Sequence, residues 1–172
     1  MAGRALYLVV CGAPAAADVD SFVRLAQEAG WLVRVIATPM GSRFLDSDRL
    51  ADLTGAPVRT DFRMPDETSN GLPPADAVLV APATFNTINK WALGITDNVA
   101  LGMLCELVGF GVPTLAVPQL KAELASHVAF GPNLEALRSM GVRVMFDPAA
   151  PPTERMPRWE DILKELSSLL NS

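Results

Sequence analysis

The sequence is poor in the residue types that supply most metal, redox and acid–base chemistry. It contains one histidine and two cysteines among 172 residues. Cys11 and Cys105 lie far apart and fit no metal-ligand spacing, so we predict no metal site and interpret both as reduced, buried thiols. Lysine and arginine number 14 against 19 aspartates and glutamates, and no basic run is present. This charge balance argues against nucleic acid or an anionic membrane as a partner.

Long hydrophobic runs are also missing. No apolar stretch approaches the roughly 20 residues that a transmembrane helix needs. The first ten residues lack the long apolar core of a signal peptide and are typical of a strand, so we predict a cytoplasmic protein. Half of the residues are hydrophobic, and this length favours one domain with a well-filled core.

Short apolar runs alternate with segments of helical periodicity along the chain. The expected helices include one that Asp18 caps, one that Ser42 caps, one at 86–93, one that Asp97 caps, and one or two within 120–140. This alternation is typical of an α/β fold, and we predict a Rossmann-like, doubly wound parallel sheet in a single three-layer αβα domain. The expected strands lie at 6–10, 32–37, near Val58, 77–81, 114–117 and 142–146.

The predicted domain covers residues 1–147 and contains a polar loop at 63–74. Residues 148–172 are predicted to form a proline-rich connector and an amphipathic helix that begins near Arg158. Its apolar residues form one stripe. The pattern leaves open whether this stripe packs on its own domain or on a partner subunit.

A ligand site is expected where the strand order of the sheet reverses. Ligands of doubly wound sheets bind beyond the carboxyl ends of the strands at that point. The loops expected there are 12–17, after the first strand, and 81–84, after the strand at 77–81. The small residues of the first loop allow a phosphate to approach the backbone, although neither GxGxxG nor a Walker sequence is present, and the turn has packing as its alternative role. Thr84 and Asn86 are either ligand contacts or simple helix caps.

A sequence motif narrows these alternatives. Pro82–Thr87 reads Pro-Ala-Thr-Phe-Asn-Thr, and Lys90, Gly94, Asp97 and Asn98 follow it. This segment resembles the Pro-Ala-Ser-Ala-Asn-Thr signature of the homo-oligomeric flavin-containing cysteine decarboxylases. That family includes phosphopantothenoylcysteine decarboxylases and decarboxylases of lantibiotic-type peptides. The resemblance covers residues 6–146, and the Gly12 turn, 35–39, Phe44 and 53–55 fall in the family's order.

The resemblance implies FMN as the cofactor, a Rossmann-like fold, and homotrimers or larger assemblies with flavin near a subunit boundary. Carried over to this chain, Gly12 and Ala13 meet the phosphate and Asn86 faces the substrate. Asp97 and Asn98 hold their loop in shape, and Lys90 is a helix-surface charge. The implied FMN-binding residues are Gly12, Ala13, Pro14, Thr38, Ser42, Ala81, Pro82, Thr84, Asn86 and Thr87.

The sequence departs from the family pattern at two places. Family members have a histidine shortly before the Ala-Asp pair that stands here at 75–76, but residues 67–72 contain none. The chain's histidine, His127, lies elsewhere, and we interpret it as a surface or capping residue. The family segment Pro-x-Met-Asn-x-x-Met-Trp reads Pro-Gln-Leu-Lys-Ala-Glu-Leu-Ala here, which places Lys121 at the asparagine position. Lys121 is then either a solvated helix charge or a group that binds a substrate carboxylate or phosphate.

The resemblance implies a reaction in which flavin oxidises a cysteine thiol to a thioaldehyde, after which CO2 is lost. We therefore predict an FMN-dependent, decarboxylase-like lyase that acts on a cysteine-type thiol or on another small acid or peptide C-terminus, with Asn86 and Lys121 as its catalytic candidates. The alternative is a flavin-binding carrier, sensor or regulatory subunit that has lost decarboxylation. A prenylated-flavin synthase is disfavoured because the first loop lacks the Gly-Ala-Ser-Gly of those enzymes.

Overall fold

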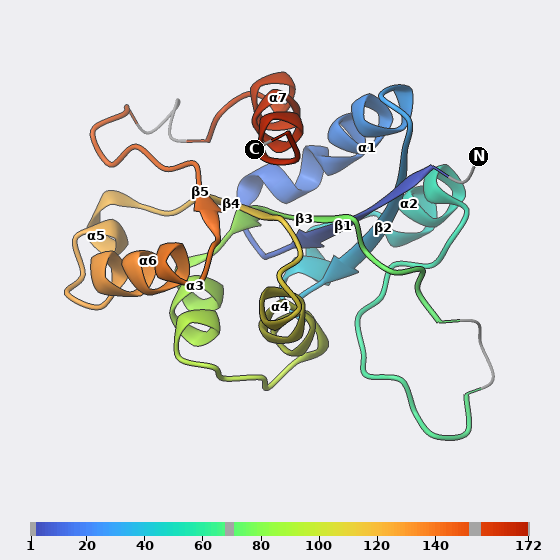
Figure 1. The fold of residues 1–172 in the computed structure, drawn as a ribbon, viewed down its shortest axis with the longest axis horizontal. Helices are drawn as coiled ribbons and strands as arrows, with labels where there is room; N and C mark the ends of the chain where they lie inside the picture. Colours follow the sequence, from blue (N-terminus) through green and yellow to red (C-terminus); the bar gives the residue numbers. More distant parts are fainter. Residues whose placement is uncertain (1–2, 68–70, 152–155, 172) are drawn as a thin grey trace.

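A five-stranded parallel sheet forms the centre of the molecule (Figure 1). The computed structural model describes residues 3–67, 71–151 and 156–171. The strand order β2-β1-β3-β4-β5 reverses direction between β1 and β3, which confirms the predicted doubly wound fold. The strands are β1 (Arg4–Val10), β2 (Trp31–Ala37), β3 (Ala77–Ala83), β4 (Thr114–Pro118) and β5 (Arg143–Val144).

Helices cover both faces of the sheet and give the three predicted layers. One face carries α1 (Val19–Glu28), α2 (Ser47–Thr54) and α7 (Trp159–Leu169). The opposite face carries α3 (Phe85–Ala92), α4 (Val99–Gly109) and α6 (Phe130–Ser139). The short helices are η1 (Pro14–Asp18), η2 (Gly41–Arg43) and α5 (Ala122–Ala125).

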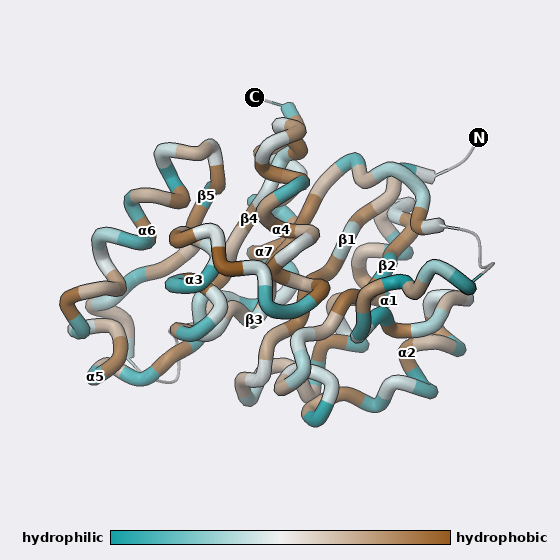
Figure 2. The backbone as a smooth tube through the Cα atoms, turned by 90° about the horizontal axis from the view of Figure 1, so that it is seen from below, coloured by the Kyte–Doolittle hydropathy of each residue, from teal (hydrophilic) through white to brown (hydrophobic). Residues whose placement is uncertain are grey.

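The two faces explain why the central strands are continuously apolar. Along β1, Leu6 and Leu8 pack on the α1 side, whereas Tyr7 and Val9 pack on the α4 side. Figure 2 shows hydrophobic residues in succession along β1. All seven residues of β3 are likewise buried. Burial on both faces requires such runs in a parallel sheet.

The C-terminal helix α7 packs against α1 of its own chain. Ile162 and Leu166 have no exposed surface and belong to the core on that face. The ring of Trp159 lies 5.5 Å from that of Phe22. Its Nε1 donates to Asp18 Oδ2 at 3.0 Å. The sequence left open whether this apolar stripe packs on its own domain or on a partner subunit. In the structure it packs on its own domain.

The structure corrects two predicted strands. The segment near Val58 forms only an isolated bridge between Ile36 and Arg59, in which Arg59 N–H donates to Val35 and Ala37 N–H donates to Arg59. Pro57, which has no N–H, stands immediately before this segment and limits its pairing. The last strand is β5, which has two residues rather than the five expected at 142–146. Both segments lie at the edges of the sheet, where a strand has a neighbour on one side only. Few paired residues are enough to hold an edge segment in place.

Two predicted helix caps are also wrong. Ser42 lies in η2, and α2 begins only at Ser47, where Asp46 Oδ1 accepts the N–H of Arg49 at 3.0 Å. The cap of α4 is Asn98, whose Oδ1 accepts the N–H of Leu101 at 3.0 Å, rather than Asp97. In both cases a neighbouring Asp or Asn side chain reaches the free amide.

The polar loop at 63–74 contains no helix or strand in its described part, and residues 68–70 lie outside that part. Tyr7 Oη donates to the carbonyl of Pro73 at 2.6 Å and so fixes the end of the loop to β1. Across residues 3–67, 71–151 and 156–171, every helix is too short or too polar to span a bilayer.

Candidate functional site

The loops after β1 and β3 lie side by side at the carboxyl edge of the sheet. The parallel register pairs Val9 with Val80, and Cys11 N–H donates to the carbonyl of Pro82 at 3.1 Å. The turns near Gly12 and Thr84 therefore meet, as the sequence predicts from the reversal of strand order.

A cavity of about 710 Å³ opens between these loops, and we call it the main cavity. This volume lies within the range of about 300–1,000 Å³ that is usual for small-molecule and cofactor sites. Eight of the residues suggested from the sequence line it, namely Gly12, Ala13, Pro14, Thr38, Thr84, Asn86, Thr87 and Lys121.

Three other suggested residues lie outside the lining. Ala81 and Pro82 are buried in β3, directly behind the cavity wall. Ser42 lies in η2, and its hydroxyl donates to the carbonyl of Pro39 at 2.8 Å. These residues support the wall through the backbone rather than through a side chain exposed to the cavity.

Backbone amides of the first loop already donate hydrogen bonds to other groups of the protein. Ala13 N–H donates to the carbonyl of Cys11 at 2.9 Å, and Ala15 N–H donates to Gln119 Oε1 at 2.9 Å. The side chain of Gln119 thus occupies the start of η1, where the sequence suggested a phosphate. Thr38 Oγ1 accepts the N–H of Gly41 at 2.9 Å, which leaves its own O–H to donate to a ligand.

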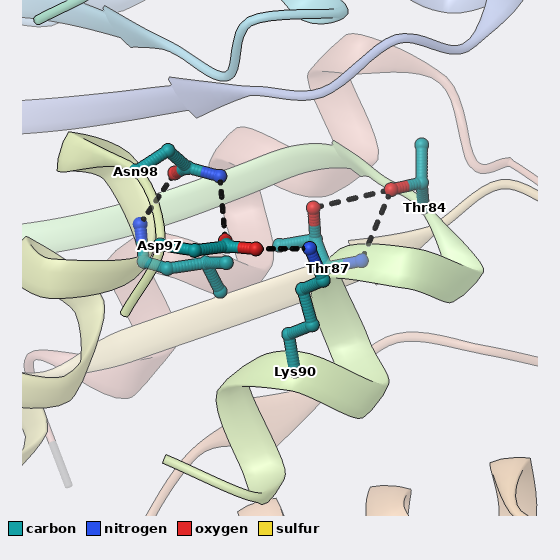
Figure 3. A network of polar contacts seen from close by, with 6 residues as sticks. Thr84, Thr87, Lys90, Asp97 and Asn98 are labelled. Carbon is teal, nitrogen blue, oxygen red and sulfur yellow. Dashed lines mark hydrogen bonds and ion pairs between the residues drawn. The ribbon is translucent and has the colours of Figure 1, made fainter. Parts of the chain in front are cut away.

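The loop after β3 is shaped by threonine hydroxyls (Figure 3). Thr84 is the N-cap of α3, and its Oγ1 accepts the N–H of Thr87 at 3.3 Å. The Oγ1 atoms of the two threonines lie 3.1 Å apart. Thr84 therefore both caps the helix and lines the cavity, so the two roles left open by the sequence coexist.

Asn86 differs from its threonine neighbours because its side chain is uncommitted. It is exposed on the first turn of α3 and lines the main cavity. No hydrogen bond of its side chain is found within the part of the chain that the structure describes. An amide in this position can both donate to and accept from a ligand.

An ion pair connects α3 with the start of α4 at the cavity wall (Figure 3). Lys90 Nζ contacts Asp97 Oδ2, and Asn98 Nδ2 donates to Asp97 Oδ1 at 3.5 Å. Because Asn98 also caps α4, these three residues hold the two helices together. Lys90 is consequently paired at the cavity wall, and its side chain stays 30% exposed, as a helix-surface charge does.

Lys121 stands on the other side of the cavity, immediately before α5. Its side chain makes no ion pair with any residue of the described ranges. The lining thus carries Lys90, Lys121 and Asp97, a formal charge of +1, in a chain whose net charge is -5. A local excess of positive charge in an acidic protein favours an anionic ligand.

The thiol of Cys11 is buried beside this site. Burial raises its pKa above the ordinary value, and hydrogen bonds with Thr87 and Thr84 offset part of the rise. Cys11 is therefore protonated at neutral pH and fills space below the loop. Among the described residues, no group of three histidine, cysteine, aspartate or glutamate side chains is arranged to hold a metal.

The sequence did not single out several side chains that line the cavity, notably Met40, Phe85 and Gln119. Phe85 stacks on Phe130 with ring centres 6.0 Å apart. Phe85 also meets His127 edge-on at 5.4 Å. For Phe85 the sequence signal that it lies at the site was its place within the Pro82–Thr87 motif. Gln119 is revealed only by its contact with Ala15, which lies 104 residues away in the sequence.

His127 caps the backbone beside this aromatic pair. Its Nδ1 accepts the N–H of Ala129 at 3.1 Å, and its side chain is exposed. It is absent from the lining of the main cavity. The surface and capping interpretation of His127 agrees with this geometry.

The residues present fit FMN. The cavity has the required size, a small-residue loop and the Thr38 hydroxyl lie on one side, and the uncommitted amide of Asn86 lies on the other. The apolar walls at Pro14, Met40 and Leu120 suit a planar ring.

Comparisons with known proteins identify the family of this chain. The chain is 30% identical over 153 residues to the coenzyme A biosynthesis bifunctional protein CoaBC of Mycolicibacterium smegmatis, an alignment that covers 87% of this chain and 36% of that protein. It therefore spans little more than a third of that relative's length. Among solved structures, cypemycin decarboxylase CypD has a TM-score of 0.77 at 25% identity, with 98% of this chain and 94% of CypD covered.

The FMN-dependent cysteine decarboxylase SpaF has the same fold, with a TM-score of 0.76 at 23% identity and with 99% of this chain and 98% of SpaF covered. The family model described as Flavoprotein matches residues 1–171. The chain therefore belongs to the flavoprotein family and is homologous to its cysteine decarboxylases.

Proposed function

We propose that this chain binds FMN in the main cavity and uses it to decarboxylate a cysteine-type thiol, or another small acid or peptide C-terminus. The observation that carries the proposal is the position of the cavity, beyond the carboxyl ends of β1 and β3 and between the Gly12 and Thr84 loops. Sheets with the order 2-1-3-4-5 bind their ligands, FMN among them, at this switch point. The homology to FMN-dependent cysteine decarboxylases supports the same reaction class.

The first loop and the loop after β2 hold the phosphate end of the cofactor in this proposal. Gly12 lets the backbone approach closely, and the O–H of Thr38 donates to a phosphate oxygen. Thr84 and Thr87 lie against the ring, and the buried Ala81 and Pro82 support the wall from behind. When bound, the flavin supplies an electron acceptor for oxidation of the substrate thiol.

Asn86 and Lys121 bind the substrate. Both line the cavity, and neither side chain is used to hold the protein together within the described residues. The Asn86 amide donates to the substrate carboxylate, and the Lys121 ammonium attracts an anionic group from the other side. Asn86 keeps the asparagine of the family signature, whereas Lys121 stands where the family's Met-Asn pair has its asparagine and takes over the positioning of the substrate there.

One observation favours the alternative of a flavin-binding protein without decarboxylase activity. The sequence has no histidine at residues 67–72, the stretch where family members have one. Residues 68–70 of this stretch lie outside the described part of the structure. The chain's histidine, His127, is bonded to Ala129 and does not line the cavity. A positioned histidine acting as general acid or base typically contributes about 10²–10⁴-fold in rate. Loss of this acid–base catalysis leaves the binding of FMN and substrate intact and slows the decarboxylation reaction.

The predicted homotrimer or larger assembly stays a prediction, and α4 is the element that bears on it. This helix has one charged residue, Glu106, and is apolar all round. Its outer side leaves Met103 and Leu107 partly exposed, and Phe110 beyond it is 80% exposed. Helices that are apolar all round are usually buried. Sedimentation equilibrium should give at least three times the chain mass of 18.3 kDa, and a monomeric mass would refute the expectation.

The ultraviolet–visible spectrum of the purified protein tests the proposal. We expect a flavin spectrum after incubation with FMN, anaerobic bleaching by a cysteine-ended peptide or by phosphopantothenoylcysteine, and release of CO2. The matched serine-ended peptide should leave the spectrum unchanged because it has no thiol to oxidise. A yellow protein that no thiol bleaches would support the flavin-binding alternative. A chain that takes up no FMN would refute both.

A further inference from the structure

The residues that line the main cavity follow the order of the strands behind them. Thr38 comes directly after β2, and Gly12 comes shortly after β1. Thr84 and Gln119 come directly after β3 and β4. Neighbouring strands of a sheet lie about 4.8 Å apart, so the ends of β2 and β4 are separated by about 14 Å. The main cavity therefore extends across the sheet from Thr38 at one end to Gln119 at the other.

This order sets the direction in which FMN lies in the proposed function. The phosphate end lies with Gly12 and Thr38, whose O–H remains available to donate. The start of η1 is not available to the phosphate, because the side chain of Gln119 already accepts the N–H of Ala15. The ring of the cofactor therefore lies over Thr84 and extends toward Gln119.

Gln119 is held at its end of the cavity by two hydrogen bonds. Its backbone N–H donates to the carbonyl of Ala83 at 2.9 Å, and its Oε1 accepts the N–H of Ala15 at 2.9 Å. The other polar atom of the side chain, Nε2, makes no hydrogen bond within the residues that the structure describes. Gln119 therefore presents an N–H donor that is fixed in position and has no partner there.

We propose that Gln119 Nε2 donates a hydrogen bond to the edge of the flavin ring and thereby raises the reduction potential of bound FMN. This inference rests on the proposed function, because it requires FMN in the main cavity. The ring edge carries carbonyl oxygens and nitrogens that accept hydrogen bonds, and these atoms gain negative charge when the ring takes up electrons. A donor that is already in place stabilises this added charge, so the flavin becomes a stronger electron acceptor for the substrate thiol.

The reduction potential of bound FMN tests this role without any substrate. Anaerobic titration with dithionite, against a dye of known potential, measures it in the wild type and in Gln119→Glu. This variant keeps an oxygen for the N–H of Ala15 and replaces the donor with a negatively charged oxygen. We expect the dissociation constant of reduced FMN to rise at least about tenfold relative to that of oxidised FMN. Such a change lowers the two-electron potential by at least about 30 mV.

Two further variants separate the donor from other causes. Gln119→Met removes the donor without adding a charge, so it should lower the potential by a smaller amount, and it carries the test if Gln119→Glu does not fold. Gln27→Glu is the matched control, because it makes the same substitution at the chain's other glutamine. Gln27 lies near the end of α1, donates to the carbonyl of Leu53 and is absent from the cavity lining. Its replacement should leave the potential unchanged.

The outcomes separate this inference from the proposed function. A wild-type potential in both Gln119 variants, or an equal shift in Gln27→Glu, would overturn the role of Gln119 even when FMN binds. The expected shift in a protein whose flavin no thiol bleaches would support the role of Gln119 and contradict the proposed decarboxylation. A chain that takes up no FMN would overturn both proposals.

Discussion

Gly12 is the position where a single added carbon should test the cofactor site most directly. A Cβ atom built there lies 2.4 Å from Met40 Cγ, 2.9 Å from Met40 Cβ and 3.1 Å from the Met40 carbonyl carbon. Non-bonded carbon atoms normally stay about 3.5–4.0 Å apart. Gly12 has no positive φ, so crowding and not backbone strain is what an alanine introduces.

The size of the effect follows from what has to move. The Met40 side chain is half exposed and can rotate, but it lines the main cavity, and the contact with its carbonyl carbon also displaces the backbone. Overpacking of this kind costs about 1–3 kcal/mol. If that cost falls on the bound state, the dissociation constant for FMN in Gly12→Ala rises about 5- to 150-fold, since 1.4 kcal/mol is tenfold.

Fluorescence titration of FMN into the FMN-free protein measures this constant. Gly131→Ala serves as the control, because its Cβ meets nothing within 4 Å, and FMN affinity should not change. Met40→Ala removes the Cγ that lies closest but keeps the Cβ and the carbonyl carbon, so the double variant Gly12→Ala/Met40→Ala should recover part of the lost affinity. Wild-type affinity in Gly12→Ala, or no recovery in the double variant, would refute the assignment of Gly12 and Met40 to the cofactor wall.

Four further predictions concern the substrate side and the Cys11 thiol. Asn86→Asp should slow anaerobic bleaching by at least about tenfold, while the amount of FMN bound per chain stays unchanged. The reason is that a carboxylate at this position repels the substrate carboxylate and has no N–H to donate. Loss of flavin from this variant would contradict the role of Asn86. Lys121→Met should raise the KM for an anionic substrate and weaken its dependence on salt, whereas Lys164→Met, on α7, should change neither. Because burial raises the pKa of Cys11, an aromatic disulfide reagent should modify it at pH 8 only after unfolding. Because the pKa of this thiol is higher in the folded state than in the unfolded state, its contribution to the free energy of unfolding is complete below the ordinary thiol pKa of 9.0. This contribution should be lost as the pH rises through the folded-state pKa. A free energy of unfolding that increases above pH 9 would contradict the shift.

The fold could be predicted because its strongest signals are local. The apolar runs of β1 and β3 are buried on both faces, so the sequence itself marks them as central strands. The errors concentrate where pairing is weak. The segment near Val58 and the last strand sit at the two ends of the sheet, and their extents depend on contacts that a short apolar run does not specify.

The site was predictable only in part for a related reason. Gly12 and Thr84 could be located from the strand order together with the motif at Pro82–Thr87, because both signals are local. Gln119 and Met40 could not, since they reach the cavity through contacts that only the folded chain creates. The same holds for the role of Lys90, whose pairing with Asp97 depends on how α3 and α4 meet.

The polar side chains around the main cavity divide into those that hold its loops and those that remain available. Thr84 caps α3, Asn98 caps α4, and Gln119 fixes η1, so replacing any of them changes the shape of the site. Asn86 and Lys121 have no such partner within the described residues, although both line the cavity. Because the fold does not require these two side chains, it places no constraint on their chemistry. The substrate accepted by this flavoprotein scaffold should therefore be decided mainly at positions 86 and 121, and exchanging these residues should alter selectivity before it alters stability.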